Sequence, residues 1–162
     1  MTNPMDAAER LALTFTQGGM QRTTARVMSA LLFADQETTT AGELADRLQI
    51  SPGTVSTALK NLFTVGLIER VPAPGSRREH FRFRDDAWTT LMSSKNTTLK
   101  VMQDAAQEGI DAAGEDSIAG RRLIEMRDFY SYLMTELPAV IDRWTSGEIE
   151  RGGRGRHTPR QA

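Results

Sequence analysis

Apolar residues in the first part of the chain recur at the spacing of an α-helix. The first set lies at i, i+3, i+4 and i+7 and consists of Ala8, Leu11, Ala12 and Phe15. Gly18 and Gly19 follow and end this pattern. A second set consists of Val27, Met28, Leu31 and Leu32. It predicts another amphipathic helix, which Thr23 or Thr24 can cap and which runs to about Asp35.

Two short helices are predicted next, each with its own start signal. The run Thr40-Ala41-Gly42-Glu43 has the form of a capping box, in which a threonine hydroxyl and a glutamate carboxylate satisfy free amides at a helix start. The residues that share one face of this helix are Leu44, Ala45 and Leu48. Ser51 can cap the next helix, with Pro52 at its first position. Two helices joined by a short turn predict a helix-turn-helix.

The second of these helices has two different faces. Its inward stripe consists of Val55, Ala58, Leu59, Leu62 and Phe63, and its outer face consists of Gly53, Ser56, Thr57, Lys60, Asn61 and Thr64. An ordinary solvated face would mix Glu with Lys, but this outer face has no acidic group. A helix that enters the major groove of double-stranded DNA needs small polar side chains and no group that repels phosphate. The candidate base-contacting residues are Gly53, Thr54, Ser56, Thr57, Lys60 and Asn61.

A basic β-hairpin is predicted directly after this helix. Gly66 ends the helix, and the segments around Ile68 and over 79–84 alternate as two short strands, with Phe81 and Phe83 on one face. The turn between the strands is rich in Pro, Gly and Ser and places two arginines at an exposed tip. A hairpin of this kind after a recognition-type helix forms a winged helix. The residues expected to contact phosphate or the minor groove are Arg77, Arg78 and Arg82.

The segment from Thr40 to Trp88 resembles the MarR family of bacterial transcriptional regulators, in particular its GbsR-like branch. The resemblance is most specific in the wing run GLIERVPAPGSRREHFRFRDDAW, and it continues upstream in GMQRTTARV at 19–27. It covers roughly residues 8–90. The family implies a dimer in which the first helix joins the interface, the second supports the DNA-reading head, and a small-molecule effector modulates binding.

The resemblance also implies a pocket for that effector between the reading head and the dimerisation helices. Its expected lining residues are Trp88, Met92, Met126, Phe129 and Tyr130. Each of these residues also suits a place in an apolar core, so both interpretations stay open.

Two long helices are predicted after the wing. Asp85-Asp86 can cap the first, whose apolar residues are Trp88, Leu91, Met92, Leu99, Met102 and Ala106. Gly109 and Gly114 are expected to weaken or end it. The second repeats apolar residues at alternating gaps of four and three, a heptad seam that consists of Ala119, Leu123, Met126, Tyr130, Leu133, Leu137, Val140 and Trp144. Pro138 lies inside the seam and is expected to kink or break the helix near Met134 to Glu136.

A heptad seam can pack on its own domain or against a second copy of the chain. The winged helix has its own apolar core, so the C-terminal helices need another surface, and this favours a homodimer. The expected interface residues are Leu123, Met126, Tyr130, Leu133, Leu137, Val140 and Trp144.

Charge is distributed unevenly along the 162 residues, although the formal net charge is only −1. Residues 40–84 contain seven Lys/Arg and four Asp/Glu, whereas residues 104–150 contain four and eleven. A basic reading head on an acidic body suits a DNA-binding protein, because only one surface should approach phosphate. The Arg/Gly-rich tail is expected to be disordered, with mild nonspecific affinity for DNA.

Other kinds of chemistry have few candidate residues. Cysteine is absent and there are two histidines, so neither a thiol site, nor a metal site, nor a cofactor is expected. The glycine motifs of nucleotide-binding enzymes and a serine–histidine constellation are missing, so no enzyme is expected. Without an apolar run of about 18 residues or a leader peptide, we expect a cytoplasmic protein that does not span a membrane.

The predicted fold class is mainly α with a small β-hairpin wing: a winged helix-turn-helix plus a helical dimerisation region. The expected domains are an N-terminal helix that supports dimerisation at 1–19, the DNA-binding domain at 20–86, the dimerisation region at 87–148 and a disordered basic tail at 149–162. The predicted function is a MarR-type regulator that binds an inverted-repeat operator as a homodimer. One alternative is a winged helix used for protein–protein contact or assembly, without sequence-specific DNA binding. Another is the dimerisation head of a methyltransferase, which fails unless the chain is a fragment, because no cofactor domain follows in this sequence.

Overall fold

Helices make up most of the structure, a computed structural model that describes residues 3–147. The chain divides into two units, the first up to Leu91 and the second from Met92. The predicted basic tail at 149–162 lies outside the described residues. Among the residues in 3–147, no helix has the length and apolar character needed to cross a membrane.

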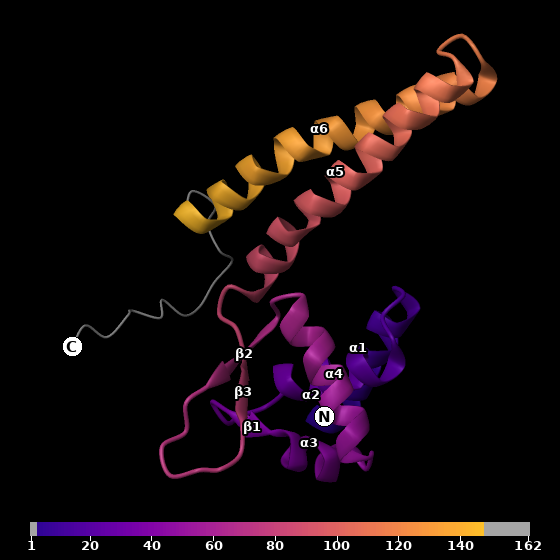
Figure 1. Cartoon of the computed structure of the whole chain (residues 1–162). Helices are drawn as coiled ribbons and strands as arrows, with labels where there is room; N and C mark the ends of the chain where they lie inside the picture. The colour runs from indigo at the N-terminus through magenta and orange to yellow at the C-terminus, as the bar shows by residue number, and fades with distance from the viewer. Residues whose placement is uncertain (1–2, 148–162) are drawn as a thin grey trace. The chain divides into compact units, whose positions relative to one another are not determined.

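The first unit contains the helices α1 (Pro4–Gln17), α2 (Arg22–Leu32), α3 (Ala41–Leu48) and α4 (Pro52–Thr64), as Figure 1 shows. The predicted end of α1 is confirmed, because Gly18 is its C-cap. The predicted start of α2 was wrong: the helix begins at Arg22 after Gln21 and ends at Leu32. Thr24 lies inside this helix and is buried, and its hydroxyl donates to Gln21 Oε1 at 2.9 Å. The threonine therefore ties the first turn together from within instead of capping it.

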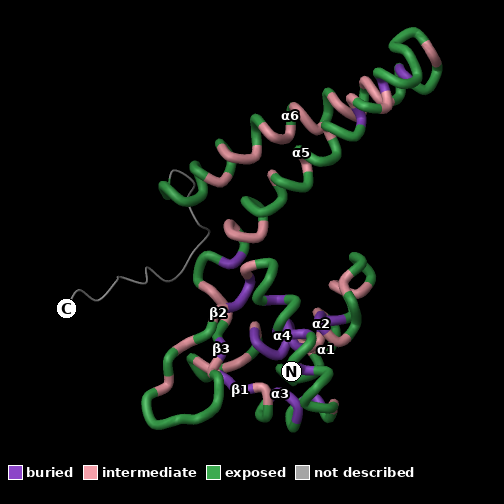
Figure 2. The backbone as a smooth tube through the Cα atoms, viewed as in Figure 1, coloured by how far each residue is buried: buried purple, intermediate pink, exposed green. Residues whose placement is uncertain are grey.

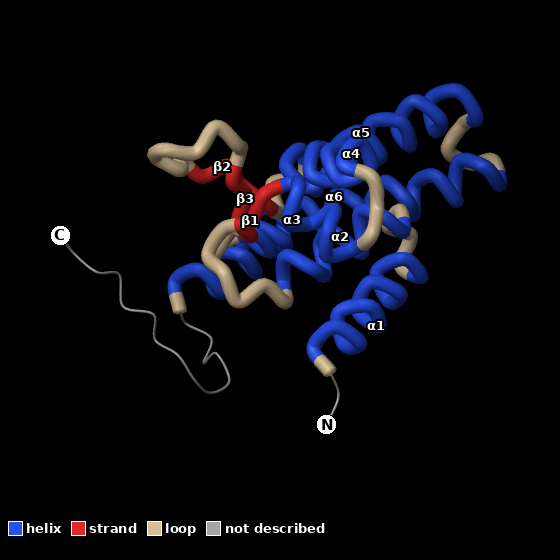
Figure 3. The backbone as a smooth tube through the Cα atoms, turned by 90° about the horizontal axis from the view of Figure 1, so that it is seen from below, coloured by secondary structure: helices blue, strands red, loops and turns tan. Residues whose placement is uncertain are grey.

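The first unit also contains a three-stranded antiparallel sheet with the strand order β1-β3-β2. One of its strands precedes α3 in the chain, and the other two follow α4. Its strands are β1 (Thr39–Thr40), β2 (Ile68–Val71) and β3 (His80–Phe83). The predicted hairpin of β2 and β3 is confirmed, with Glu69 opposite Arg82. The strand β1 was not predicted, and it pairs Thr39 with Phe81. Figure 3 shows the loop between β2 and β3 extending beyond the strands.

The apolar core of the first unit lies between α2, α3, α4 and the base of the sheet. Figure 2 shows buried residues gathered in these elements. The largest fully buried apolar side chains of this core are Met28, Leu44, Leu62, Leu67, Ile68, Val27 and Val55. Four members of the predicted inward stripe of α4 are buried, but Phe63 is 44% exposed. Its ring instead lies 4.9 Å from the guanidinium carbon of Arg70, a cation–π contact at the surface.

The second unit is a helical hairpin made of α5 (Ala87–Ala113), whose first turn belongs to the first unit, and α6 (Ile118–Ser146). Figure 1 shows the two helices side by side near the turn that joins them. Gln103 Nε2 donates to Ser131 Oγ at 2.7 Å, and Arg127 Nη1 donates to Gln107 Oε1 at 3.0 Å. Ser117 caps α6, because its hydroxyl accepts from the amide of Gly120 at 2.8 Å.

The expectations for these helices were correct in part. The predicted end of α5 at Gly114 is confirmed, because the helix ends at Ala113 and Gly114 has a φ of 79°. Gly109 does not end α5; a Cβ at this position would lie 2.7 Å from Leu123 Cδ1, so the glycine permits close approach of α6. The predicted break at Pro138 was wrong, because α6 continues to Ser146, and the predicted kink stays a prediction. A proline removes one backbone hydrogen bond, but α6 runs on both sides of Pro138, from Ile118 to Ser146.

Candidate nucleic-acid interface

The outer face of α4 is solvent-exposed along its length. Ser51 caps the helix, since its Oγ accepts from the amide of Thr54 at 3.2 Å. The six predicted base-contacting residues, Gly53, Thr54, Ser56, Thr57, Lys60 and Asn61, are all exposed. The buried stripe of Val55, Ala58, Leu59 and Leu62 holds the opposite side in the core. The helix is therefore anchored by one face and presents the other to solvent.

Hydrogen bonds within α4 divide its outer side chains into two groups. The hydroxyl of Thr57 donates to the carbonyl of Gly53 at 3.1 Å, and that of Thr64 donates to the carbonyl of Lys60 at 2.9 Å. Within the described part of the chain, the side chains of Ser56, Lys60 and Asn61 make no hydrogen bond or ion pair. These three are thus available to bind an external partner without breaking an internal contact.

Gly53 is not needed for packing inside the protein. A Cβ built at this position meets nothing within 4 Å. Its φ is also not in the left-handed region. No internal constraint of the described structure therefore requires glycine at the second position of α4, and the free space above it faces solvent.

The wing places two arginines at its tip, as predicted. Arg77 and Arg78 are both exposed, and their guanidinium groups have no partner among residues 3–147. The turn is held by local bonds: Ser76 Oγ accepts from the amide of Arg78 at 3.1 Å. His80 Nε2 lies 3.2 Å from Ser76 Oγ, while its Nδ1 lies 3.2 Å from Thr38 Oγ1. The histidine thus connects the turn to the chain before β1.

Arg82 is exposed on β3 but is not free. Its Nε donates to Glu69 Oε1 at 2.6 Å, and this bond holds the pKa of Arg82 above its ordinary value. Arg84 is paired as well, with Asp86 at 2.8 Å. The hydrogen bond from Arg84 lowers the pKa of the Asp86 carboxyl. The wing arginines therefore differ: Arg77 and Arg78 at the tip have no carboxylate partner in the described structure, whereas Arg82 in β3 and Arg84 after it are each paired with a carboxylate.

A groove of about 690 Å³ lies between α4 and the wing. It brings together three of the predicted DNA contacts, Ser56, Lys60 and Arg78. Arg70 also lines it, and this residue was missed in the sequence-based set. Arg70 lies 3.2 Å from Glu79, at the end of the same hairpin. Strand pairing places Arg70 opposite Phe81, which lines the same groove, and this register is defined only in the folded hairpin.

The capping box positions α3 relative to the sheet. Thr40 Oγ1 accepts from the amide of Glu43 at 3.3 Å, and Glu43 Oε2 accepts from the amide of Thr40 at 2.8 Å. The second bond, to a backbone amide, is the main reason why the pKa of Glu43 lies below its ordinary value. Gln49 ends α3 in the left-handed conformation, with φ 53°, which turns the chain towards α4.

The predicted effector-pocket residues differ in their aromatic contacts and in their exposure to solvent. The ring of Trp88 is 5.6 Å from that of Phe83, and the ring of Phe129 is 5.9 Å from that of Tyr130. Trp88, Met92 and Phe129 are exposed, whereas Met126 and Tyr130 are partly buried. Across residues 3–147, no cluster of three or more His, Asp or Glu could hold a metal ion.

Comparison with known proteins yields matches along most of the chain. Residues 18–79 match the model of the MarR family, and residues 86–147 match a model described as an MmpR5-like MarR family transcriptional regulator. The chain is 31% identical over 142 residues to the HTH-type transcriptional regulator MmpR5 of Mycobacterium tuberculosis (strain ATCC 25618 / H37Rv), which covers 87% of this chain and 86% of that protein. It is also similar to the crystal structure of a transcriptional regulator, with a TM-score of 0.80 and 30% identity, over 90% of this chain and 99% of the other.

Proposed function

Because the chain belongs to the MarR family of transcriptional regulators, we propose that it acts by binding duplex DNA through α4 and the wing. The observation that carries this proposal is the outer face of α4, which is exposed, has unengaged polar side chains and contains no carboxylate. DNA repels carboxylates and attracts cations along its whole length. Lys60 and Arg78 line the same groove beside this face, which supports a joint role of helix and wing.

The two groups of residues have different roles in this proposal. Asn61 can form a bidentate pair with adenine, and Lys60 can donate to guanine, so these two would read sequence in the major groove. Gly53, Thr54, Ser56 and Thr57 are the remaining base-facing residues. Arg77, Arg78 and Arg82 would contact phosphate or the minor groove and would position the protein on DNA of any sequence.

We further propose a homodimer held by the C-terminal helices. The seam residues Leu123, Met126, Tyr130, Leu133 and Leu137 are only partly buried within one chain, while Val140 and Trp144 are exposed. A second copy would remove this apolar surface from water. Residues 20–86 would then read DNA, residues 87–148 would dimerise, and residues 1–19 would support the interface. A two-fold dimer needs half-sites about 34 Å apart or a multiple of that distance, so the operator is an inverted repeat.

We also propose that a small-molecule effector modulates DNA binding at Trp88, Met92, Met126, Phe129 and Tyr130. It rests on the family alone. The GbsR-like branch likewise stays a prediction, and the model that matches residues 86–147 is described as MmpR5-like.

Selection of bound sequences from a random duplex pool tests the DNA-binding proposal. The wild-type protein should enrich an inverted repeat. The Asn61→Ala variant should enrich a different or more degenerate half-site, with a loss of about 1–3 kcal/mol on the original one. Arg77→Ala should keep the sequence preference but bind all duplexes more weakly, with a flatter salt dependence.

The control is Arg10→Ala, because Arg10 is an exposed arginine on α1, away from α4 and the wing. It should behave as the wild-type protein does. If no sequence is enriched and the affinity for duplex DNA is no higher than that of the Arg77→Ala variant, the winged helix does not read DNA. That result would favour a role in protein–protein contact.

A further inference from the structure

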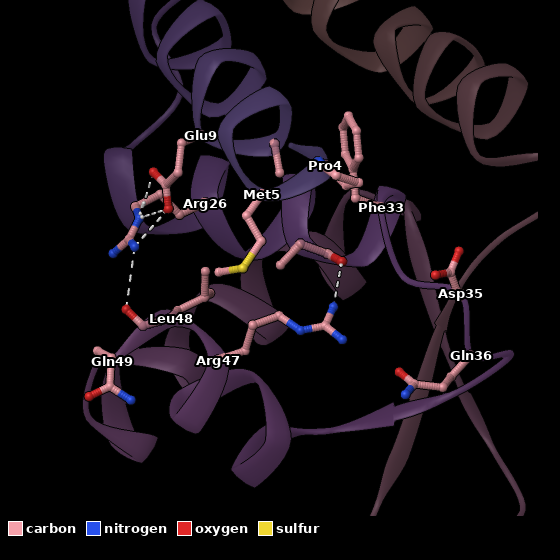
Figure 4. A pocket seen from close by; sticks show the side chains of 12 residues that line it. Pro4, Met5, Glu9, Arg26, Phe33, Asp35, Gln36, Arg47, Leu48 and Gln49 are labelled. Carbon is pink, nitrogen blue, oxygen red and sulfur yellow. Dashed lines mark hydrogen bonds and ion pairs between the residues drawn. The ribbon is translucent and has the colours of Figure 1, made fainter. Parts of the chain in front are cut away.

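A pocket of about 420 Å³ lies within the first unit, between α1, α2 and α3, and is drawn in Figure 4. This volume falls in the range of about 300–1,000 Å³ that is typical of small-molecule sites. The pocket shares no residue with the groove beside α4 or with the predicted effector site. All of its walls come from the first unit, so it is complete in a single chain.

One part of the pocket is apolar and open to solvent. Met5 and Ala8 of α1, Ala30 of α2, and Phe33 and Leu48 line it. Met5 is 61% exposed and Phe33 is 40% exposed, so two large apolar side chains border the cavity without being covered. An apolar group that enters would remove their surface from water, which is favourable.

The charged groups of the pocket are of two kinds. Arg26 and Glu9 neutralise each other: Arg26 Nη2 lies 2.8 Å and Nε 3.0 Å from Glu9 Oε1. Arg26 Nη2 also donates to the carbonyl of Leu48 at 3.3 Å. This pair is therefore satisfied within the protein, and it closes one side of the pocket, as the dashed lines in Figure 4 show.

Arg47 has no such neutralisation. Its Nη1 reaches the carbonyl of Ala30 at 3.5 Å, beyond the usual hydrogen-bond range of about 2.7–3.2 Å. No carboxylate within residues 3–147 forms an ion pair with it, although Asp35 also lines the pocket. Figure 4 shows the guanidinium directed into the space below Met5 and Phe33. The guanidinium of Arg47 can form a bidentate pair with a carboxylate, and the apolar side chains of Met5 and Phe33 lie beside it. This arrangement suits a ligand that has a carboxylate at one end and an apolar group at the other.

We propose that this pocket binds a small amphipathic monocarboxylate, whose carboxylate pairs with Arg47 and whose apolar part lies against Met5, Phe33 and Leu48. The site adjoins α3 of the helix-turn-helix and Gln49, the residue that turns the chain towards α4. A ligand here is thus placed next to the DNA-reading elements. The binding itself is independent of the proposed DNA contacts, because it requires neither α4 nor a second copy of the chain.

Isothermal titration of the full-length protein with octanoate, in the absence of DNA, tests the proposal. Octanamide, an analogue of similar shape without the charge, is titrated in parallel. The test variant is Arg47→Met, which keeps the long apolar stem and removes the guanidinium, and Arg47→Lys retains the cation. Arg10→Met is the matched control, because it removes an exposed arginine of α1 that does not line the pocket. Thermal melting confirms that each variant is folded.

The expected result is saturable binding of octanoate to the wild-type and Arg10→Met proteins. Arg47→Met should weaken it about tenfold or more, as the loss of a charge-assisted pair does, and Arg47→Lys should retain part of the affinity. Octanamide should bind wild type as weakly as octanoate binds Arg47→Met. The proposal is overturned if the wild-type protein binds no octanoate at millimolar concentration. It is also overturned if Arg47→Met binds octanoate as tightly as wild type does, or if wild type binds octanamide as tightly as octanoate. If Tyr130→Ala loses octanoate binding and Arg47→Met retains it fully, the proposal is also overturned. The ligand would then bind at the predicted effector site that includes Tyr130.

Discussion

Arg82 and Glu69 face each other across β2 and β3, and the Arg82 Nε donates to Glu69 Oε1 at 2.6 Å. The carboxylate neutralises an arginine that the sequence pattern assigns to DNA. Arg77 and Arg78, on the same hairpin, have no carboxylate partner among the described residues. The wing therefore contains two arginines, Arg77 and Arg78, that are unpaired in the described structure, and two, Arg70 and Arg82, that must exchange a carboxylate partner before they can bind phosphate.

Removal of the Glu69 carboxylate should strengthen DNA binding. In Glu69→Gln the guanidinium of Arg82 is released, so affinity for duplex of any sequence should rise. The slope of log affinity against log salt should steepen by about 0.9, the value for one added phosphate contact. Asp46→Asn is the control, since it removes an exposed carboxylate of α3 that has no ion pair in the described structure. Equal salt slopes in the two variants would mean that Arg82 does not reach DNA.

Gly53→Ala should maintain or raise the stability of the protein and lower its DNA affinity. The added Cβ meets nothing within 4 Å in the free protein, and alanine favours helix by up to about 1 kcal/mol over glycine. The melting temperature should therefore stay the same or rise. Affinity for the selected operator should fall if the backbone at Gly53 approaches the bases closely. The affinity for the operator is measured by fluorescence anisotropy. If it is unchanged, the first turn of α4 does not closely approach the base pairs in the major groove.

The double variant Leu133→Glu, Leu137→Glu should be monomeric in sedimentation equilibrium. Both leucines are only partly buried within one chain, and two charges cannot be desolvated in an apolar interface without partners. Thr135→Glu is the control on an exposed position between them and should remain dimeric. Far-ultraviolet circular dichroism should show that α6 is retained in both. A dimer of unchanged mass in the double variant would exclude this seam from the interface.

Glu43→Gln should destabilise the first unit at neutral pH, but less so in acid. The pKa of Glu43 in the folded protein lies below its ordinary value of 4.5, chiefly because of the hydrogen bond from the amide of Thr40. A lowered folded pKa stabilises the protein above the unfolded pKa, and this contribution is lost as the pH falls through the folded pKa. The difference in melting temperature between the two proteins should therefore shrink below about pH 4.5. A difference that is constant with pH would show that the charge of Glu43 plays no part.

Features that depend on neighbours within a few residues could be predicted from the sequence alone. The capping box of Thr40 and Glu43 and the serine cap at Ser51 needed only the local order of residue types. The buried and exposed faces of α4 followed from helical spacing, because Val55, Leu59 and Leu62 recur on one side. The hairpin was recognisable from alternation and from its turn residues. The candidate DNA-facing residues could be assigned from these same local patterns.

Features that depend on distant partners were decided by the tertiary structure. Thr39 and Thr40 form a strand only because β3 lies beside them, about forty positions further along the chain. Phe63 lies at the surface beside the guanidinium of Arg70, and Arg82 is neutralised because Glu69 lies across the strand pair. Gly109 admits α6, and α6 continues through Pro138. For the strand β1, the Arg82–Glu69 pair and Gly109, the deciding group lies on another element, and its position is defined only when the chain folds. Local spacing, by contrast, determines which residue types share a face before any fold exists.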